Sequence, residues 1–189
     1  MIVGVLGIQG GFGKHKEMID SLGYKTRIVR TPEELVKTDA LIIPGGESTT
    51  FLNLFEKLQL REAILEYNKK SPIMGTCAGL IVLSKAVEGI NYPPLNLIDI
   101  DVDRNAYGRQ KESFIDSIEL NLNSKKQKFE AVFIRAPKIK KHGSDCKVLA
   151  KLQNEIVMLE NDSVLVCTFH PELTGNKVIH KYFIESFAI

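Results

Sequence analysis

The sequence predicts an α/β fold, with a doubly wound, mostly parallel sheet, helices on both faces and an antiparallel extension. Three observations support this fold class. In the first half, continuous apolar runs alternate with stretches whose apolar residues recur at helical spacing. Strands with continuous apolar runs are buried on both faces, which is typical of parallel sheets between helices. In the second half, apolar and polar residues alternate, as in half-exposed antiparallel strands.

The first half is expected to contain four strands and four helices. The apolar runs predict strands at Ile2–Ile8, Lys25–Val29, Ala40–Ile43 and Ile73–Met74. The helical spacing predicts helices at Lys14–Leu22, Glu33–Val36, Thr49–Asn68 and Gly79–Ala86. A glycine-rich turn, Gly10–Gly13, leads from the first strand into the first helix. This succession of strand and helix is the pattern of a doubly wound core.

The second half is expected to contain further strands and a terminal helix. The strands are predicted at Leu97–Asp103, Phe114–Leu122, Phe129–Ile134, Val148–Leu152, Glu155–Leu159 and Val164–Phe169. An amphipathic pattern predicts a helix at Lys177–Phe187. Turn residues punctuate this half, but no linker, repeat or low-complexity segment divides it. We therefore expect one domain over residues 1–189, a length that suits a single core.

Composition and charge exclude several classes of protein. A hydrophobic content of 44% and a charged content of 25% are those of a globular protein. The net charge is +2 with no long basic stripe, so a nucleic-acid partner is not expected. The lysine clusters at 125–128 and 138–141 are interpreted as solvated surface, with a partner-docking patch as the alternative.

The cysteine count and the first apolar run indicate a cytoplasmic protein. Three cysteines, Cys77, Cys146 and Cys167, are an odd number without disulfide-framework spacing, which favours a reducing compartment. The run Ile2–Ile8 lacks a basic n-region and a cleavage site, and it is too short to span a bilayer. We interpret it as a buried strand, and we expect no membrane association.

Cys77 is the strongest candidate nucleophile. It lies in Gly75-Thr76-Cys77-Ala78-Gly79 after an apolar run, the cysteine form of a nucleophile elbow at a strand-to-helix junction. A helix N-terminus favours the thiolate, and the amide of Ala78 can help to hold an oxyanion. The alternative is a small buried cysteine between packed glycines. Cys167, inside an apolar strand, is expected to be core, and Cys146 has no candidate base beside it in sequence.

His170 and Glu172 are the candidate base and its orienting carboxylate. His170 follows an apolar strand and precedes Pro171, which restrains it to extended conformations. Glu172 is close enough to bond one imidazole nitrogen and leave the other facing a thiol, which is the logic of a triad. An ordinary loop is the alternative. The other histidines, His15, His142 and His180, are expected to be structural or exposed, and no Cys/His spacing suggests a metal site.

Two further features suggest a ligand site, and the second of them suggests a ligand with a carboxylate. The loop Pro44–Ser48 leaves a strand with two glycines that let main-chain amides approach a ligand, though it lacks the lysine of a phosphate loop. An ordinary turn capped by Ser48 or Thr49 is the alternative. Arg104 and Arg135 interrupt strand-like apolar sequence, and arginine pairs well with carboxylates, although each could be a surface arginine.

These motifs occur together in one known family. The blocks are Gly7-Ile-Gln-Gly10, Pro44-Gly-Gly-Glu-Ser-Thr-Thr50, Gly75-Thr-Cys-Ala-Gly79, Arg104-Asn-Ala-Tyr-Gly-Arg-Gln110, Phe133-Ile-Arg-Ala-Pro137 and Phe169-His-Pro-Glu-Leu-Thr174. Over essentially its whole length the chain resembles the class I (triad) glutamine amidotransferases, which have a flavodoxin-like fold. More narrowly, it resembles the glutaminase subunits of pyridoxal 5'-phosphate synthase. A departure from that family is Lys14, where an acidic residue is usual.

The resemblance implies roles for individual residues. Cys77, His170 and Glu172 would form the catalytic triad, and the amides of Gly46 and Ala78 would hold the oxyanion. The residues that would contact L-glutamine are Gly46, Glu47, Ser48, Arg104, Ile134 and Arg135.

The resemblance also implies a reaction and a partner. Glutamine would be hydrolysed to glutamate and ammonia through a cysteine thioester, with no cofactor on this chain. The ammonia would pass to a synthase subunit, a (β/α) barrel, in a large hetero-oligomer that makes pyridoxal 5'-phosphate from a pentose phosphate and a triose phosphate. The alternatives are a glutaminase serving a different synthase, a γ-glutamyl hydrolase, or a non-enzymatic regulator on the same fold.

Overall fold

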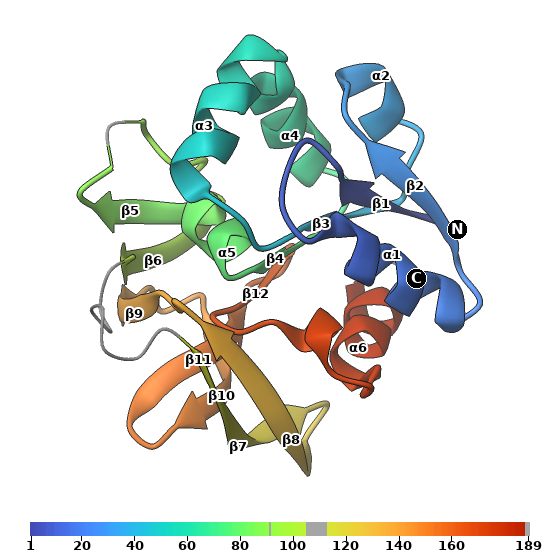
Figure 1. Cartoon of the computed structure of the whole chain (residues 1–189). Coiled ribbons are helices and arrows are strands. Elements are labelled where there is room, and N and C mark those ends of the chain that lie inside the picture. The colour runs from blue at the N-terminus through green and yellow to red at the C-terminus, as the bar shows by residue number, and fades with distance from the viewer. Residues whose placement is uncertain (91, 105–112, 188–189) are drawn as a thin grey trace.

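A computed structural model of the chain describes residues 1–90, 92–104 and 113–187 (Figure 1). In this described part, nine strands form one sheet in the order β2-β1-β3-β4-β12-β11-β10-β7-β8, and three form a smaller sheet in the order β5-β6-β9. Helices cover both faces of the large sheet, so the predicted α/β class is confirmed.

One end of the large sheet is parallel. Its strands are β1 (Ile2–Leu6), β2 (Lys25–Val29), β3 (Ala40–Ile43), β4 (Ile73–Thr76) and β12 (Val164–Cys167). Side chains alternate between two apolar clusters, since Leu41 and Ile43 pack on one face and Ala40 and Ile42 on the other. Burial on both faces explains why these strands read as continuous apolar runs.

Strand β12 joins the parallel core from the second half of the chain. It pairs in parallel with β4, with Val164 opposite Ile73 and Cys167 opposite Thr76, and antiparallel with β11 on its other side. The predicted antiparallel extension did not specify the direction of this strand, because an apolar run does not reveal its neighbours. The register matters for function, since the segments after β4 and β12 leave the sheet side by side.

The other end of the large sheet is the predicted antiparallel extension. It consists of β11 (Glu155–Glu160), β10 (Lys147–Leu152), β7 (Ser113–Leu122) and β8 (Lys125–Ile134), joined by antiparallel pairs. Along β7 from Ile118 and along β8 from Phe129, buried residues alternate with more exposed ones, as expected where one face is solvated.

The helices form two layers. In the described part, α1 (Phe12–Ser21) and α6 (Val178–Phe187) pack on one face; α2 (Pro32–Leu35), α3 (Ser48–Lys57), α4 (Leu60–Asn68) and α5 (Ala78–Leu83) pack on the other. Figure 1 shows α1 beside α6 and the second group across the sheet from them. No helix in the described ranges is long and apolar enough to cross a membrane.

The prediction of one helix over Thr49–Asn68 is wrong, because the chain breaks at Gln59. Gln59 has a left-handed φ of 54° and separates α3 from α4. Phe55 and Leu60 are both fully buried but are five residues apart, a step that a continuous helix would turn to different faces. The break brings both apolar faces onto the core.

The prediction of a helix over Gly79–Ala86 is also wrong at its end. The helix α5 stops at Leu83, where the Ser84 hydroxyl donates to the Ile81 carbonyl and the backbone becomes extended. The next residues form β5 (Ser84–Glu88), which pairs in parallel with β6 (Ile98–Asp103).

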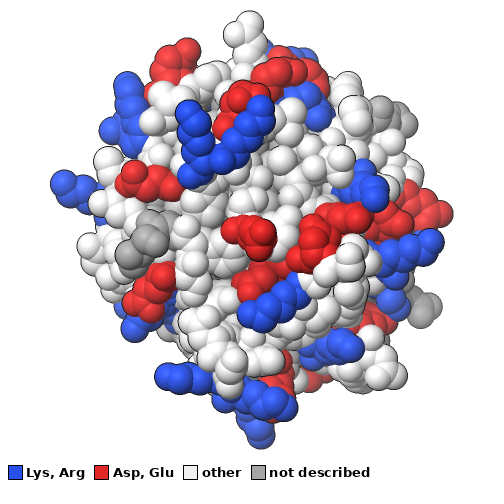
Figure 2. Space-filling view, turned by 180° about the vertical axis from the view of Figure 1, so that it is seen from behind, with Lys and Arg blue, Asp and Glu red and all other residues white. Residues whose placement is uncertain are grey.

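The lysine cluster at 138–141 lies in a strand that the sequence did not predict. Strand β9 (Lys138–His142) pairs antiparallel with β6, and Lys140 forms an ion pair with Glu88 at 2.6 Å. Its lysines reach solvent, while Ile139 packs inward. Figure 2 shows basic and acidic side chains intermixed over the face seen from behind, in keeping with the small net charge.

Candidate active site

Cys77 lies at the junction between β4 and α5. It is buried, at 7% exposure, and its backbone has φ 49° and ψ −103°, an uncommon conformation for a residue other than glycine. A Cβ added at Gly75 would crowd the backbone of Gly79, and one added at Gly79 would overlap the carbonyl of Ile43. The two glycines therefore let α5 begin close against the sheet, which is the geometry of a nucleophile elbow.

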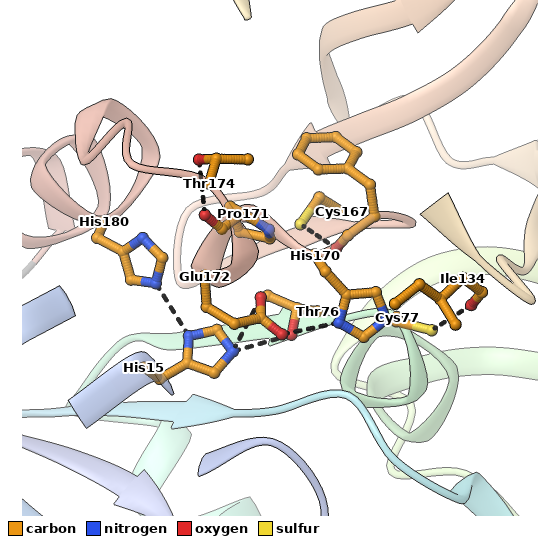
Figure 3. Close-up of polar contacts among 11 residues, drawn as sticks. His15, Thr76, Cys77, Ile134, Cys167, His170, Pro171, Glu172, Thr174 and His180 are labelled. Carbon is orange, nitrogen blue, oxygen red and sulfur yellow. Dashed lines mark hydrogen bonds and ion pairs between the residues drawn. The ribbon is translucent and has the colours of Figure 1, made fainter. Parts of the chain in front are cut away.

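His170 and Glu172 follow the neighbouring strand, β12. The amide of His170 donates to the Val132 carbonyl at 2.8 Å, which ties this segment to β8. The chain then forms the short 3₁₀ turn η1 (Pro171–Leu173), which carries Glu172 back under the imidazole. Glu172 Oε1 lies 2.7 Å from His170 Nδ1. Figure 3 shows Cys77 on the other side of the His170 ring, so the three side chains form a row.

The electrostatics of this row favour a charged imidazole. Burial alone lowers the pKa of His170, but hydrogen bonds with Cys77 and Glu172, and the charges of both groups, raise it to about 10. Burial raises the pKa of Glu172, whereas interactions with His15 and His170 hold it below its usual value. An imidazolium beside a thiol favours the thiolate as nucleophile.

A cavity of about 510 Å³ lies above Cys77 and His170. Its volume suits a small molecule such as an amino acid. Apart from Glu172, which lies behind His170, every site residue that the sequence predicts lines this cavity. They are Gly46, Glu47, Ser48, Cys77, Ala78, Arg104, Ile134, Arg135 and His170.

The glycine loop forms one wall of the cavity. Gly45 packs directly against the imidazole of His170, and its carbonyl accepts a hydrogen bond of 3.1 Å from the amide of Gly11. Gln9, which is not among the predicted site residues, binds both backbone groups of Glu47: its Nε2 donates to the Glu47 carbonyl at 2.9 Å, and its Oε1 accepts from the Glu47 amide at 3.2 Å. In the sequence, the feature that could have indicated Gln9 as a site residue is its position just after the first strand.

The two arginines occupy different environments. Arg104 Nη1 donates to Thr49 Oγ1 at 2.8 Å, while its buried Nε has no hydrogen-bond partner in the described part of the chain. Arg135 is largely exposed and lies 3.5 Å from Glu47 Oε1. The carbonyl of Ile134 accepts from the Cys77 thiol at 3.7 Å. The rest of the Arg104 motif, residues 105–110, lies outside the described residues.

Two histidines beside Glu172 are also absent from the predicted site. His15 and His180 are fully buried and in contact with each other, whereas His142 is exposed. The sequence-based expectation treats all three alike, as structural or exposed, and it gives the buried pair no link to the triad. No local pattern signals that link, because the contacts join α1, α6 and η1 across the fold.

Comparisons with known proteins point to one family. A sequence model of the SNO glutamine amidotransferase family matches residues 5–189. The chain is 49% identical over 186 residues to "Pyridoxal 5'-phosphate synthase subunit PdxT" of Fervidobacterium nodosum, covering 98% of this chain and 96% of that protein. It is 47% identical to the protein of the same name from Thermosipho africanus, covering 98% of each.

A solved structure extends the match to three dimensions. The crystal structure of a glutamine amidotransferase superimposes with a TM-score of 0.92 and 40% sequence identity, covering 98% of each chain. Because the family match, the identities and the fold all span nearly the whole length, the chain belongs to the SNO glutamine amidotransferase family.

Proposed function

We propose that this chain hydrolyses L-glutamine to L-glutamate and ammonia, using Cys77, His170 and Glu172 as its catalytic triad. The observation that carries the proposal is the row of three side chains at the floor of a cavity of amino-acid size. Membership in a glutamine amidotransferase family supports the choice of substrate.

The first half of the reaction forms a thioester. The Cys77 thiolate attacks the side-chain amide carbon of glutamine, and negative charge develops on the amide oxygen. The amides of Gly46 and Ala78 hold this oxyanion, a contribution of roughly 2.7–4 kcal/mol per donor. The His170 imidazolium gives its proton to the departing nitrogen, so that ammonia leaves and a glutamyl thioester on Cys77 remains.

The second half of the reaction releases glutamate. Neutral His170 takes a proton from water as that water attacks the thioester, and Cys77 leaves as a thiolate beside the regenerated imidazolium. The buried carboxylate of Glu172 orients the ring and balances its charge throughout. No cofactor takes part in these steps.

The carboxylate and amino groups of glutamine need partners in the cavity. We assign the carboxylate to Arg104, because Arg104 lines the cavity and a guanidinium group pairs well with a carboxylate. Glu47, Ser48, Ile134 and Arg135, which also line the cavity, complete the substrate contacts.

The same proposal includes a partner and a pathway. The relatives named above are subunits of pyridoxal 5'-phosphate synthase, and their similarity spans almost the entire chain. We propose that this single-domain chain delivers ammonia to a (β/α)-barrel synthase subunit in a hetero-oligomer that makes pyridoxal 5'-phosphate. Its three free cysteines suit the reducing cytoplasm.

Substitution of the nucleophile tests the proposal. We expect Cys77→Ser to abolish ammonia release from glutamine in the complex with the synthase subunit, because a serine hydroxyl stays protonated beside an imidazolium. Cys146→Ser is the matched control, because Cys146 contacts Asp99 and Asp145 and lies away from the cavity. Ammonia release is measured at saturating glutamine, and a glutamine-like electrophile should label Cys77 alone. Normal turnover by Cys77→Ser would contradict the mechanism.

A further inference from the structure

A buried chain of polar side chains continues the triad beyond Glu172. His15 on α1 lies with its Nε2 3.3 Å from Glu172 Oε2 and 3.2 Å from the hydroxyl of Thr76. Its other nitrogen, Nδ1, lies 2.9 Å from Nε2 of His180 on α6. Figure 3 shows the row from His180 through His15 and Glu172 to His170. Four separate elements meet here, and both distal histidines are fully buried.

Burial favours the neutral form of both distal histidines. Burial lowers the pKa of His15, with an opposing effect of Glu172 and a smaller lowering effect of His170. Burial, followed by the proximity of His15, lowers the pKa of His180 to about 3. A neutral imidazole carries one N–H and one lone pair, so the chain admits two arrangements of protons.

The contacts select one of these arrangements. If His15 carried its proton on Nδ1, its Nε2 lone pair would face the carboxylate oxygen of Glu172, and His180 would hold an N–H at Nδ1. His180 Nδ1 is buried and has no hydrogen-bond partner in the described residues, and buried N–H groups without an acceptor are rare. In the opposite arrangement, His180 Nδ1 carries only a lone pair and no N–H. His180 Nε2–H then donates to His15 Nδ1, and the His15 proton is on Nε2, between Thr76 and Glu172.

We propose that His15 is a positioning residue for the glutaminase reaction, acting through Glu172. Its Nε2–H attracts Glu172 Oε2, which is buried and makes no regular hydrogen bond within the described residues. This contact keeps Oε1 aimed at His170 Nδ1 while the imidazole alternately holds and gives up its proton. His180 fixes the tautomer of His15. The inference rests on the proposed function and extends it from three residues to five.

A matched pair of variants tests this role. Methionine and glutamine have similar length, but only glutamine can present an N–H near the position of the histidine Nε2. We expect His15→Met to lower kcat about 10- to 100-fold with KM changed less than about threefold, because a small displacement of a catalytic group has effects of this size. We expect His15→Gln to restore most of that loss. Both are measured as glutamine-dependent ammonia release in the complex with the synthase subunit.

A double-mutant cycle separates positioning from general destabilisation. If His15 acts through Glu172, His15→Met should lower kcat less than about threefold in a Glu172→Gln background. Tyr182→Phe is the control for damage to α6, because Tyr182 is buried but its hydroxyl bonds Glu160, not the triad. It should lower stability and leave kcat unchanged. An equal loss of kcat with and without Glu172→Gln would overturn the proposal.

The proton arrangement can be measured without activity. Histidine ¹⁵N–¹H correlation spectra of the wild-type chain at neutral pH distinguish the two tautomers. The groups that face His15 are Glu172, His170, His180 and Thr76, and we expect Nε2–H forms for both His15 and His180. An Nδ1–H form of His15 would overturn the proposal even if glutamine is the substrate. Absence of any glutaminase activity in the wild-type complex, with the expected tautomers present, would instead reject the proposed function.

Discussion

Gly45 illustrates how a single missing side chain shapes the site. A Cβ at this position would overlap the imidazole of His170, and the backbone cannot retreat freely because the Gly45 carbonyl holds the amide of Gly11. The ring would have to turn away from Cys77 or from Glu172. We expect Gly45→Ala to lower kcat for ammonia release about 10- to 100-fold.

Gly13→Ala is the matched control for Gly45→Ala. Gly13 lies in α1, and an added Cβ there meets nothing within 4 Å. Alanine favours the helix over glycine by roughly 0.5–1 kcal/mol, so this variant should keep its activity and gain stability. Activity of Gly45→Ala equal to that of Gly13→Ala would mean that the His170 ring tolerates displacement.

At the residue scale, the side chains that meet at the candidate site were predictable from the sequence where the signal is a local motif. For Cys77, the two flanking glycines indicate the geometry of the turn. For His170, the following Pro171 and Glu172 indicate the direction of the ring and its carboxylate partner. No adjacent residues indicate the contacts of Gln9 and His15. Their partners lie 38 and 157 positions away along the chain, at Glu47 and Glu172, so only the folded chain reveals what they touch.

At the element scale, the break at Gln59 stores strain that can be relieved. A left-handed conformation costs a residue with a Cβ roughly 1–2 kcal/mol, and glycine avoids most of that cost. We expect Gln59→Gly to raise the free energy of unfolding by up to about 1 kcal/mol, measured by urea denaturation. Glu62→Gly, at an exposed position inside α4, should lower it by about 1 kcal/mol. Loss of stability in both variants would show that the Gln59 side chain itself holds the turn.

Whether a segment forms a helix or a strand was predictable where its apolar residues recur with a clear period. Which strands pair with each other in the sheet was not predictable. The alternation along β7 and β8 and the apolar runs of β1 and β3 gave the correct types. The position of β12 beside β4 depends on pairing between distant segments, which an apolar run does not encode. Strand β9 escaped prediction because four of its five residues are Lys or His, and its charges are satisfied by neighbouring strands only after folding.

At the scale of the whole molecule, the histidines buried between α1 and α6 should make stability depend on pH. The pKa of His180 is about 3 in the folded chain, against about 6.5 when it is exposed, and the pKa of His15 is lowered in the same direction. Below pH 6.5 the unfolded chain binds protons that the folded chain excludes, so the folded state loses stability as the pH falls from 6.5 toward 3. For His180 alone the slope is about 1.4 kcal/mol per pH unit. His170 acts oppositely: its raised pKa stabilises the fold at neutral pH, and this contribution is lost as the pH rises through about 10.

Replacing His180 isolates its part of this dependence. We expect the unfolding free energy of His180→Leu, measured by urea denaturation between pH 6 and pH 4.5, to fall less steeply than that of the wild type, by up to about 1.4 kcal/mol per pH unit. The carboxylates titrate in both proteins, so the difference in slope reports the histidine. His142→Leu removes an exposed histidine and should leave the slope of the wild type unchanged. Parallel curves for wild type and His180→Leu would mean that His180 takes up its proton in the folded chain, and the buried row behind Glu172 would then carry a charge at acid pH.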